Sequence, residues 1–223
     1  MKLSLINNYL IYAFYDRMGI IDFHVVESLK KYSKFFNIIF VSNISIKKNE
    51  QKKLSFVKKI IISEHNEMDF GSWKVGLEFI KKKKKENVLL LNDSIIGPFV
   101  NLKFILENAK FQKCDFWGIT SAGKDDKYHI QSYFIFFNKN CLSNKFFKDF
   151  FSGIKKVSSK SELVNKYEIG LTQGLLKNGM TCKTLLTNFQ KDIFADEKCI
   201  DLFLERKLPY FKVKNIVSNP FRI

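Results

Sequence analysis

The chain has 223 residues, which is enough for one sizeable core but would crowd two full domains, so we expect residues 1–223 to form a single domain. Hydrophobic residues make up 46% and aromatic residues 15% of the sequence, which excludes a disordered or low-complexity chain. The formal net charge of +16 permits contact with nucleic acid or with an anionic membrane surface. Because the basic residues are scattered and match no nucleic-acid-binding module, a nucleic-acid partner is not expected.

The sequence also indicates in which cellular compartment the protein is expected. No apolar segment approaches the length of a membrane span, and no signal-peptide cleavage site follows the N-terminal apolar stretch, which Asn7 and Asn8 interrupt. We therefore expect a cytoplasmic protein, and the positive charge adds the expectation of peripheral binding to the inner face of the cytoplasmic membrane. The four cysteines lie far apart without a CxxC pair, which predicts reduced side chains rather than a zinc site or a disulfide framework.

In the first half of the chain, strands and helices are expected to alternate. Apolar segments at residues 9–15, 37–42, 57–62 and 88–91 predict buried strands, and the last of these is apolar without alternation, as suits a strand covered on both faces. A helix is expected at about 21–34. A second begins at Asp69, which is placed to cap it, because Phe70, Trp73 and Leu77 recur at helical spacing. This alternation predicts an α/β fold with a mostly parallel sheet and helices on both faces.

The second half is expected to be mixed. A helix is predicted near 102–109, an aromatic strand over 129–138, a helix over 146–151 and a last strand over 180–186. Ser159 and Glu162 have the spacing of a capping box that opens a helix running to residue 177.

Polar residues interrupt this apolar pattern at strand ends and helix starts, and in a parallel α/β sheet such positions converge on the edge where ligands bind. Asp93, directly after the fourth strand, could hold a divalent cation, which prefers oxygen ligands; alternatively, Asn92-Asp93-Ser94 is a simple turn. Asn43 could bind a base edge and Asp69 a ribose hydroxyl, but either could instead be a turn or capping residue.

Two candidates come from the second half. Glu168, early in a helix, could deprotonate an acceptor hydroxyl, or could be an ordinary acidic residue of a first helical turn. His129 could bind a metal or a phosphate, although a lone histidine at a strand start is more often structural. The sequence contains no Walker loop, GxGxxG, HExxH or Ser-His-Asp order, which weakens the case for kinases, dinucleotide oxidoreductases, metalloproteases and hydrolases.

Several blocks, taken together and in order, resemble the rhamnan synthesis protein F family of bacterial polysaccharide biosynthesis. They are Phe14-Tyr-Asp-Arg-Met-Gly19, Phe40-Val-Ser-Asn43, Asp69-Phe-Gly-Ser-Trp-Lys74, Leu89-Leu-Leu-Asn-Asp-Ser-Ile-Ile-Gly-Pro-Phe99, Asp115-Phe-Trp-Gly-Ile-Thr120, His129-Ile-Gln-Ser-Tyr-Phe134 and Tyr167-Glu-Ile-Gly-Leu-Thr-Gln173. The resemblance implies a GT-A-like (Rossmann-like) glycosyltransferase that moves a sugar such as rhamnose from a nucleotide-sugar donor to a growing cell-surface polysaccharide or a lipid-linked glycan. The chain departs from the family at Asn66-Glu-Met-Asp69, which lacks the usual glycine, so Asn66 is a weaker candidate than Asp69.

With the resemblance included, we expect residues 1 to about 110 to form the donor-binding half and residues from about 111 to 223 to form the acceptor half. Asp93 and Glu168 are the expected catalytic residues, Glu168 as the base if the reaction inverts the anomeric centre. Asp93 would bind the diphosphate directly or through Mg²⁺ or Mn²⁺; a single carboxylate leaves metal independence open. The expected donor-binding residues are Tyr15, Asp16, Gly19, Asn43, Asp69, Lys74, Asn92, Ser94, His129 and Gln131.

A second interpretation is a non-catalytic subunit that binds a nucleotide sugar or a glycan and docks on a larger synthase at the membrane. A nucleic-acid-binding protein ranks last. The expected partners are therefore a nucleotide-sugar donor, a glycan or lipid-linked acceptor, and an anionic membrane surface or a synthase assembly.

Overall fold

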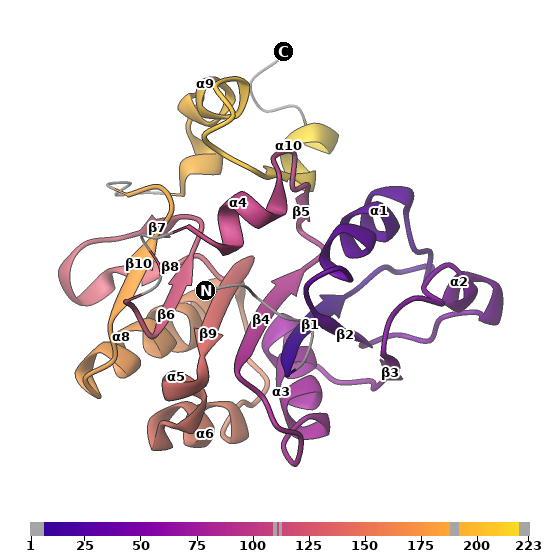
Figure 1. Ribbon diagram of the computed structural model, residues 1–223, viewed down its shortest axis with the longest axis horizontal. Coiled ribbons are helices and arrows are strands. Elements are labelled where there is room, and N and C mark those ends of the chain that lie inside the picture. The colour runs from indigo at the N-terminus through magenta and orange to yellow at the C-terminus, as the bar shows by residue number, and fades with distance from the viewer. Residues whose placement is uncertain (1–6, 109–110, 112, 188–191, 219–223) are drawn as a thin grey trace.

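The computed structural model describes residues 7–108, 111, 113–187 and 192–218, and its centre is a seven-stranded sheet of order β10-β6-β9-β4-β1-β2-β3 (Figure 1). Strands β3, β2, β1 and β4 are mutually parallel neighbours, β9 is antiparallel to β4 and β6, and β10 is parallel to β6. The strands are β1 (Asn8–Phe14), β2 (Asn37–Ser42), β3 (Lys59–Ile62), β4 (Asn87–Asn92), β6 (Phe116–Gly118), β9 (Phe134–Asn138) and β10 (Cys182–Thr184). The expected fold class, mostly parallel and mixed in the second half, is confirmed.

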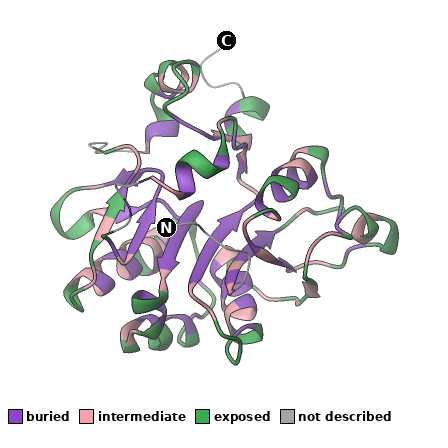
Figure 2. Ribbon diagram, in the orientation of Figure 1, coloured by how far each residue is buried: buried purple, intermediate pink, exposed green. Residues whose placement is uncertain are grey.

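Helices cover both faces of the sheet, and each face has its own apolar core. Successive side chains of a strand point to opposite faces, so Leu10 and Tyr12 of β1 belong to one core and Ile11 and Ala13 to the other. The first core is covered by α1 (Phe23–Tyr32), α4 (Leu102–Leu106) and α9 (Lys198–Leu204), the second by α3 (Met68–Phe79), α6 (Lys145–Ser152) and α8 (Gly170–Lys177). Figure 2 shows the resulting buried centre and exposed outer helix faces.

The remaining elements are short. The helices are α2 (Lys48–Lys52), α5 (Lys139–Ser143), α7 (Lys160–Leu163) and α10 (Val213–Ser218), with 3₁₀ turns at Asp125–Lys127 and Ile193–Ala195. Two antiparallel pairs flank the main sheet: β5 (Ile95–Ile96) with β11 (Phe211–Lys212), and β7 (Ser121–Ala122) with β8 (His129–Ile130). Among the described residues, no helix has both the length and the apolar character needed to cross a membrane.

The aromatic strand expected over 129–138 is wrong as a single element, because it is divided into β8 and β9. The break at residues 131–133 has a tertiary cause that an alternating pattern does not reveal. Gln131 donates to Asp192, Ser132 donates to Glu168, and the Tyr133 hydroxyl is hydrogen-bonded to Thr120. The side chains of residues 131–133 therefore make polar contacts with other parts of the chain, and the strand is interrupted at these residues.

The helix expected from Ser159 to residue 177 is present but not uniform. Ser159 accepts from the Glu162 backbone N–H at 3.1 Å, as in a capping box, while the Glu162 carboxylate accepts from Ser158 rather than from Ser159. Between α7 and α8 the helix widens into a π-helical segment, Val164–Ile169. Such segments are rare and often occur at functional sites.

Other boundaries differ by a few residues. The expected cap at Asp69 is wrong: α3 starts at Met68 with Glu67 at the capping position, so Asp69 lies within the first turn. The α4 helix ends at Leu106, and residue 109, the predicted end, lies outside the described residues. The strand expected over 57–62 starts at Lys59, and the one over 180–186 shortens to Cys182–Thr184.

Candidate functional site

The carboxyl ends of the parallel strands form the polar edge of the sheet. Tyr15 follows β1, Asn43 follows β2 and Asp93 follows β4. Two cavities of about 690 and 570 Å³ lie along this edge. They adjoin, because Phe14, Tyr15, Met68, Asp69 and Asp93 line both. Volumes of this size suit a small-molecule ligand. We call the larger cavity the main cleft and the smaller one the side cavity.

The structure brings most of the predicted residues to these cavities. Tyr15, Asp69 and Asp93 line both. The main cleft adds Asp16, Asn92, Ser94, Gln131 and Glu168, and the side cavity adds Asn43.

Three predicted donor-binding residues lie elsewhere. Gly19 closes a turn with φ +64°, in which an added Cβ would stand 2.5 Å from the Ser45 carbonyl oxygen. The Lys74 ammonium donates to the Ile154 carbonyl oxygen at 3.0 Å, which ties α3 to the segment after α6. His129 lies behind Glu168 rather than on the cleft wall, with its Nε2 3.7 Å from a Glu168 oxygen.

Asp93 links the ends of two neighbouring strands. Its Oδ2 accepts from the Tyr15 backbone N–H at 2.7 Å. The pKa of Asp93 is raised to about 7, chiefly by burial and next by the charge of Asp69, while the hydrogen bond from the Tyr15 N–H lowers it. Asp93 is therefore poised between its neutral and charged forms near neutral pH.

Asp69 projects from the first turn of α3 toward the same place. Its Oδ2 accepts from Asn92 Nδ2 at 2.7 Å, and Asn92 Oδ1 in turn accepts from the Ser94 hydroxyl at 2.7 Å. The pKa of Asp69 is raised to about 6, chiefly by burial; the hydrogen bond from Asn92 lowers it, and the charge of Glu168 raises it. Met68, just before it, has φ +52°, a conformation that favours glycine. The loop thus keeps a strained backbone at a position that lines both cavities.

Glu168 faces these aspartates from the π-helical segment. Ser132, in the break between β8 and β9, donates its hydroxyl to Glu168 Oε1 at 2.8 Å. The His129 ring, fixed by a 2.8 Å hydrogen bond between Nδ1 and the Lys127 carbonyl oxygen, stands beside Oε2. Glu168 is therefore held in one orientation at the cleft, as a general base must be.

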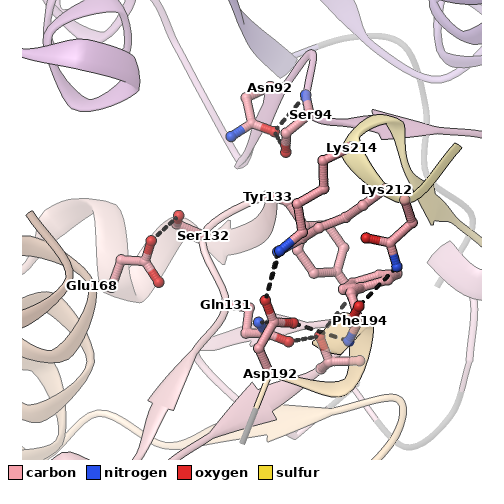
Figure 3. A network of polar contacts seen from close by, with 12 residues as sticks. Asn92, Ser94, Gln131, Ser132, Tyr133, Glu168, Asp192, Phe194, Lys212 and Lys214 are labelled. Carbon is pink, nitrogen blue, oxygen red and sulfur yellow. Dashed lines mark hydrogen bonds and ion pairs between the residues drawn. The ribbon is translucent and has the colours of Figure 1, made fainter. Parts of the chain in front are cut away.

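Other residues of the main cleft were not singled out from the sequence, among them Ser132, Lys160, Lys212 and Lys214. Asp192 forms ion pairs with the last two lysines (Figure 3). Lys212 and Lys214 belong to the C-terminal segment, where short irregular elements carry no motif. Their one signal in the sequence is a pair of lysines spaced by two, and this spacing by itself indicates no ligand.

The side cavity contains an unsatisfied acceptor. Asn43 Oδ1 is buried without a hydrogen-bond partner, and so is His24 Nε2 on the wall of the main cleft. Most buried polar atoms are paired, so an unpaired one that lines a cavity favours a ligand that completes the pair.

We tested whether the residues fit a divalent cation. Within the described part of the chain, no three His, Cys, Asp or Glu side chains are grouped as a complete metal site. The charge of Asp69, however, raises the pKa of Asp93, and both aspartates line the same cleft wall, so a cation would relieve the repulsion between them. Mg²⁺ is commonly held by one or two carboxylates together with substrate phosphates, so the carboxylates fit an ion of this kind.

A third cavity, of about 400 Å³, lies at the opposite edge of the sheet, beside Asn87 at the start of β4 and Asn138 at the end of β9. Its floor is aromatic, with Phe111 and Trp117 stacked at 4.1 Å. Its asparagines are engaged within the protein, Asn87 with Asn8 and Asn138 with Cys114. We therefore place the candidate site at the polar edge.

The sequence model of rhamnan synthesis protein F matches residues 38–222. The chain belongs to the rhamnan synthesis protein F family. The virulence protein VirA of Vibrio anguillarum is 30% identical over 123 residues, 52% of this chain and 38% of that protein. An uncharacterized protein, y4gN of Sinorhizobium fredii, is 23% identical over 177 residues, 77% of this chain and 46% of that protein. The chain thus spans less than half the length of these curated relatives.

Solved structures share the fold of this family member at low sequence identity. A glycosyltransferase involved in the glycosylation of the major capsid of PBCV-1 superimposes with a TM-score of 0.51 at 10% identity, covering 92% of each chain. A nucleoside-diphosphate-sugar pyrophosphorylase of Vibrio cholerae gives 0.50 at 14% identity, covering 79% of this chain and 90% of that one. The expected family and fold are both confirmed.

Proposed function

We propose that this chain is a glycosyltransferase that moves a sugar, with rhamnose as the first candidate, from a nucleotide-sugar donor to a growing cell-surface polysaccharide or lipid-linked glycan. One observation carries the proposal: in a member of this family, the polar edge of the sheet gathers Asp93, Asp69 and Glu168 around a cleft of nucleotide-sugar size. Ligand binding beyond the carboxyl ends of parallel strands is the general rule for such sheets.

The donor is assigned to both cavities. The nucleoside lies in the side cavity, where Asn43 Oδ1 accepts from a base N–H and Asp69 accepts from a ribose hydroxyl. Asp93 is assigned to the diphosphate, directly or together with Asp69 through Mg²⁺ or Mn²⁺. Such an ion supplies positive charge that stabilises the departing diphosphate.

Glu168 is assigned as the base that removes the proton of the acceptor hydroxyl if the reaction inverts the anomeric centre. The Ser132 hydroxyl and the His129 ring fix its carboxylate, which leaves one side of it facing the main cleft. Acceptor binding is assigned to the second half of the chain. Met18 and Phe23, exposed apolar residues close in sequence to the cleft residues Asp16 and Asp22, support an acceptor presented at an anionic membrane surface or by a synthase assembly.

The test is a thermal-shift panel of nucleotide sugars, each with and without Mn²⁺, followed by a nucleoside-diphosphate release assay with the selected donor. A ligand that binds the native state raises the melting temperature by mass action. We expect one donor to raise the melting temperature selectively, and Asp93→Ala to remove this shift. Glu168→Gln should lower the nucleoside-diphosphate release activity by about two orders of magnitude while the thermal shift persists. Asp149→Ala, an exposed aspartate on α6, is the matched control.

The outcomes separate the two interpretations. Selective binding without release, together with an Asp93→Ala effect on affinity alone, would favour the non-catalytic subunit. A folded protein that responds to no nucleotide sugar contradicts the proposal.

A further inference from the structure

The C-terminal segment places two lysines on the wall of the main cleft. In β11, Lys212 pairs with Ile95 of β5, two residues beyond Asp93, and the next residue, Val213, donates its N–H to the Ser94 carbonyl oxygen. Lys212 and Lys214 both line the main cleft. The β5–β11 pairing thus fixes these lysines relative to the strand end that carries Asp93.

Lys212 is held firmly for a lysine. Its side chain is 16% exposed, and its ammonium donates to Asp192 Oδ2 at 3.0 Å. It also lies 5.0 Å from the centre of the Phe194 ring, within range of a cation–π contact. Most lysines lie at the surface with mobile side chains, so this anchoring restricts where the positive charge can be.

The positive charge at this wall exceeds its local compensation. Asp192 is the shared partner of both lysines, with Lys214 Nζ 3.9 Å from the same oxygen (Figure 3). The other Asp192 oxygen accepts from Gln131 Nε2 at 2.9 Å and from the Phe194 backbone N–H at 3.1 Å. One carboxylate therefore balances one of two ammonium groups, and the surplus positive charge adjoins the cleft.

The main cleft also has acidic side chains. Asp69, Asp93 and Glu168 line it, and burial opposes the charged forms of Asp69 and Asp93. A ligand group with two negative charges is repelled by these carboxylates unless a cation intervenes, and it is attracted by the two lysines. A nucleotide sugar carries such a group, its diphosphate.

We propose that Lys212 and Lys214 bind the diphosphate of the donor and that Asp192 positions Lys212 for this contact. The inference rests on the proposed function, because it assumes a nucleotide-sugar donor in the main cleft. As the sugar leaves, negative charge grows on the diphosphate, and two fixed ammonium groups stabilise it.

The experiment measures binding of UDP, GDP and dTDP and of their parent nucleosides to the full chain by calorimetry, with and without Mg²⁺. The variants are Lys212→Met, Lys214→Met and the double variant, since methionine keeps most of the stem and removes the charge. Lys207→Met is the matched control, a lysine of the same C-terminal segment that pairs with Glu205 at 2.7 Å outside the main cleft. Lys214→Arg tests rescue by a conservative change.

For the diphosphate that the native chain binds, we expect at least tenfold weaker affinity in the double variant. Nucleoside affinity, the Lys207→Met control and Lys214→Arg should stay within about threefold of the native values. If Lys212→Met does not fold, Lys214→Met alone decides, because its half-exposed side chain tolerates replacement. For Lys214→Met alone, we expect at least threefold weaker affinity for the diphosphate.

Two results overturn the inference and differ from each other. If the native chain binds a diphosphate and the lysine variants bind it equally well, the lysine assignment is wrong while the proposed function stands. If the native chain binds none of the three diphosphates, both fail together.

Discussion

At the scale of single residues, the site is built from side chains whose environment opposes their charge. Asp93 and Asp69 are carboxylates in largely buried positions, with pKa values raised to about 7 and about 6. Strongly shifted carboxylates in a cleft are typical of functional sites. A group that is retained although it destabilises the fold points to a role other than stability.

Asp93→Asn should therefore stabilise the protein, and the effect should depend on pH. The folded-state pKa of Asp93, about 7, lies above the ordinary value of 3.8, so its favourable contribution is present below about pH 4 and is lost as the pH rises through 7. At pH 8 the variant should gain on the order of 2 kcal/mol, or several degrees in melting temperature. The gain should shrink steadily toward pH 5.

Thermal unfolding of the native chain and the variant at pH 5, 6, 7 and 8 provides the measurement. Asparagine keeps an oxygen that can accept from the Tyr15 N–H, so the comparison isolates the charge. A variant that is less stable at pH 8, or a gain that does not vary with pH, would show that burial does not penalise the charged form of Asp93 in the folded protein. Asp149→Asn on α6 serves as the surface control.

At the scale of elements, the position of Asp69 depends on how closely α3 approaches β1. An alanine Cβ at Gly76 would stand 2.3 Å from Ile11 Cγ2, and Ile11 is fully buried. The helix therefore lies against the strand at a distance that glycine permits. Asp69, two turns earlier on the same helix, is brought to the strand ends by this contact.

Gly76→Ala should destabilise the chain by about 1–3 kcal/mol, because overpacking forces α3 or Ile11 to move. Gly170→Ala is the matched control, since a Cβ there meets no atom of the described chain nearer than 3.8 Å. In a helix that change should be neutral or stabilising by up to about 1 kcal/mol. Urea denaturation of both variants measures the difference, and equal effects would contradict the close packing.

The elements also show where sequence patterns suffice. The strand over 37–42 is predicted to the residue, because a continuous apolar run bounded by polar residues has one simple structural solution. The break at Gln131 and Ser132 and the π-helical segment around Glu168 are not predictable in this way. Each carries a side chain that contacts a residue more than thirty positions away, Gln131 with Asp192 and Glu168 with Ser132, and such contacts leave no local pattern.

The same contrast holds for the site. The positions of Asp93 and Asn43 were predictable because parallel strands bring their carboxyl ends to one edge, and that of Asp69 because the helix after such a strand starts at the same edge. The sequence did not reveal that Lys74 lies outside both cavities, since helical periodicity does not show that its ammonium reaches the Ile154 carbonyl oxygen. Lys212 was missed because no local pattern shows that β11 pairs with β5 from more than a hundred residues away.

At the scale of the whole molecule, charge and exposed apolar side chains together favour a membrane partner. The net charge is +16, and Met18 and Phe23, 75% and 79% exposed, lie within two residues in sequence of the cleft residues Asp16 and Asp22. We expect the protein to float with phosphatidylglycerol vesicles and not with phosphatidylcholine vesicles, and high salt to weaken this binding. The single-domain organisation stays a prediction.

Phe23→Ser should weaken flotation severalfold, because an inserted aromatic ring adds to the electrostatic attraction. Phe104→Ser on α4, also strongly exposed at 70%, should leave it unchanged. Equal recovery on both vesicle types, or equal effects of the two variants, would count against a membrane-facing cleft mouth.

The main cleft is assembled from distant parts of the chain, so it can form only late in synthesis. The loop after β1 forms early on the ribosome, whereas the β11 strand that closes the cleft is among the last described residues to emerge. Until then, buried partners such as Tyr32 lack Tyr210, and the polar edge lacks its lysine wall. A chain that ends before β11 lacks the lysine wall, so a donor that needs this wall can stabilise only chains that include β11.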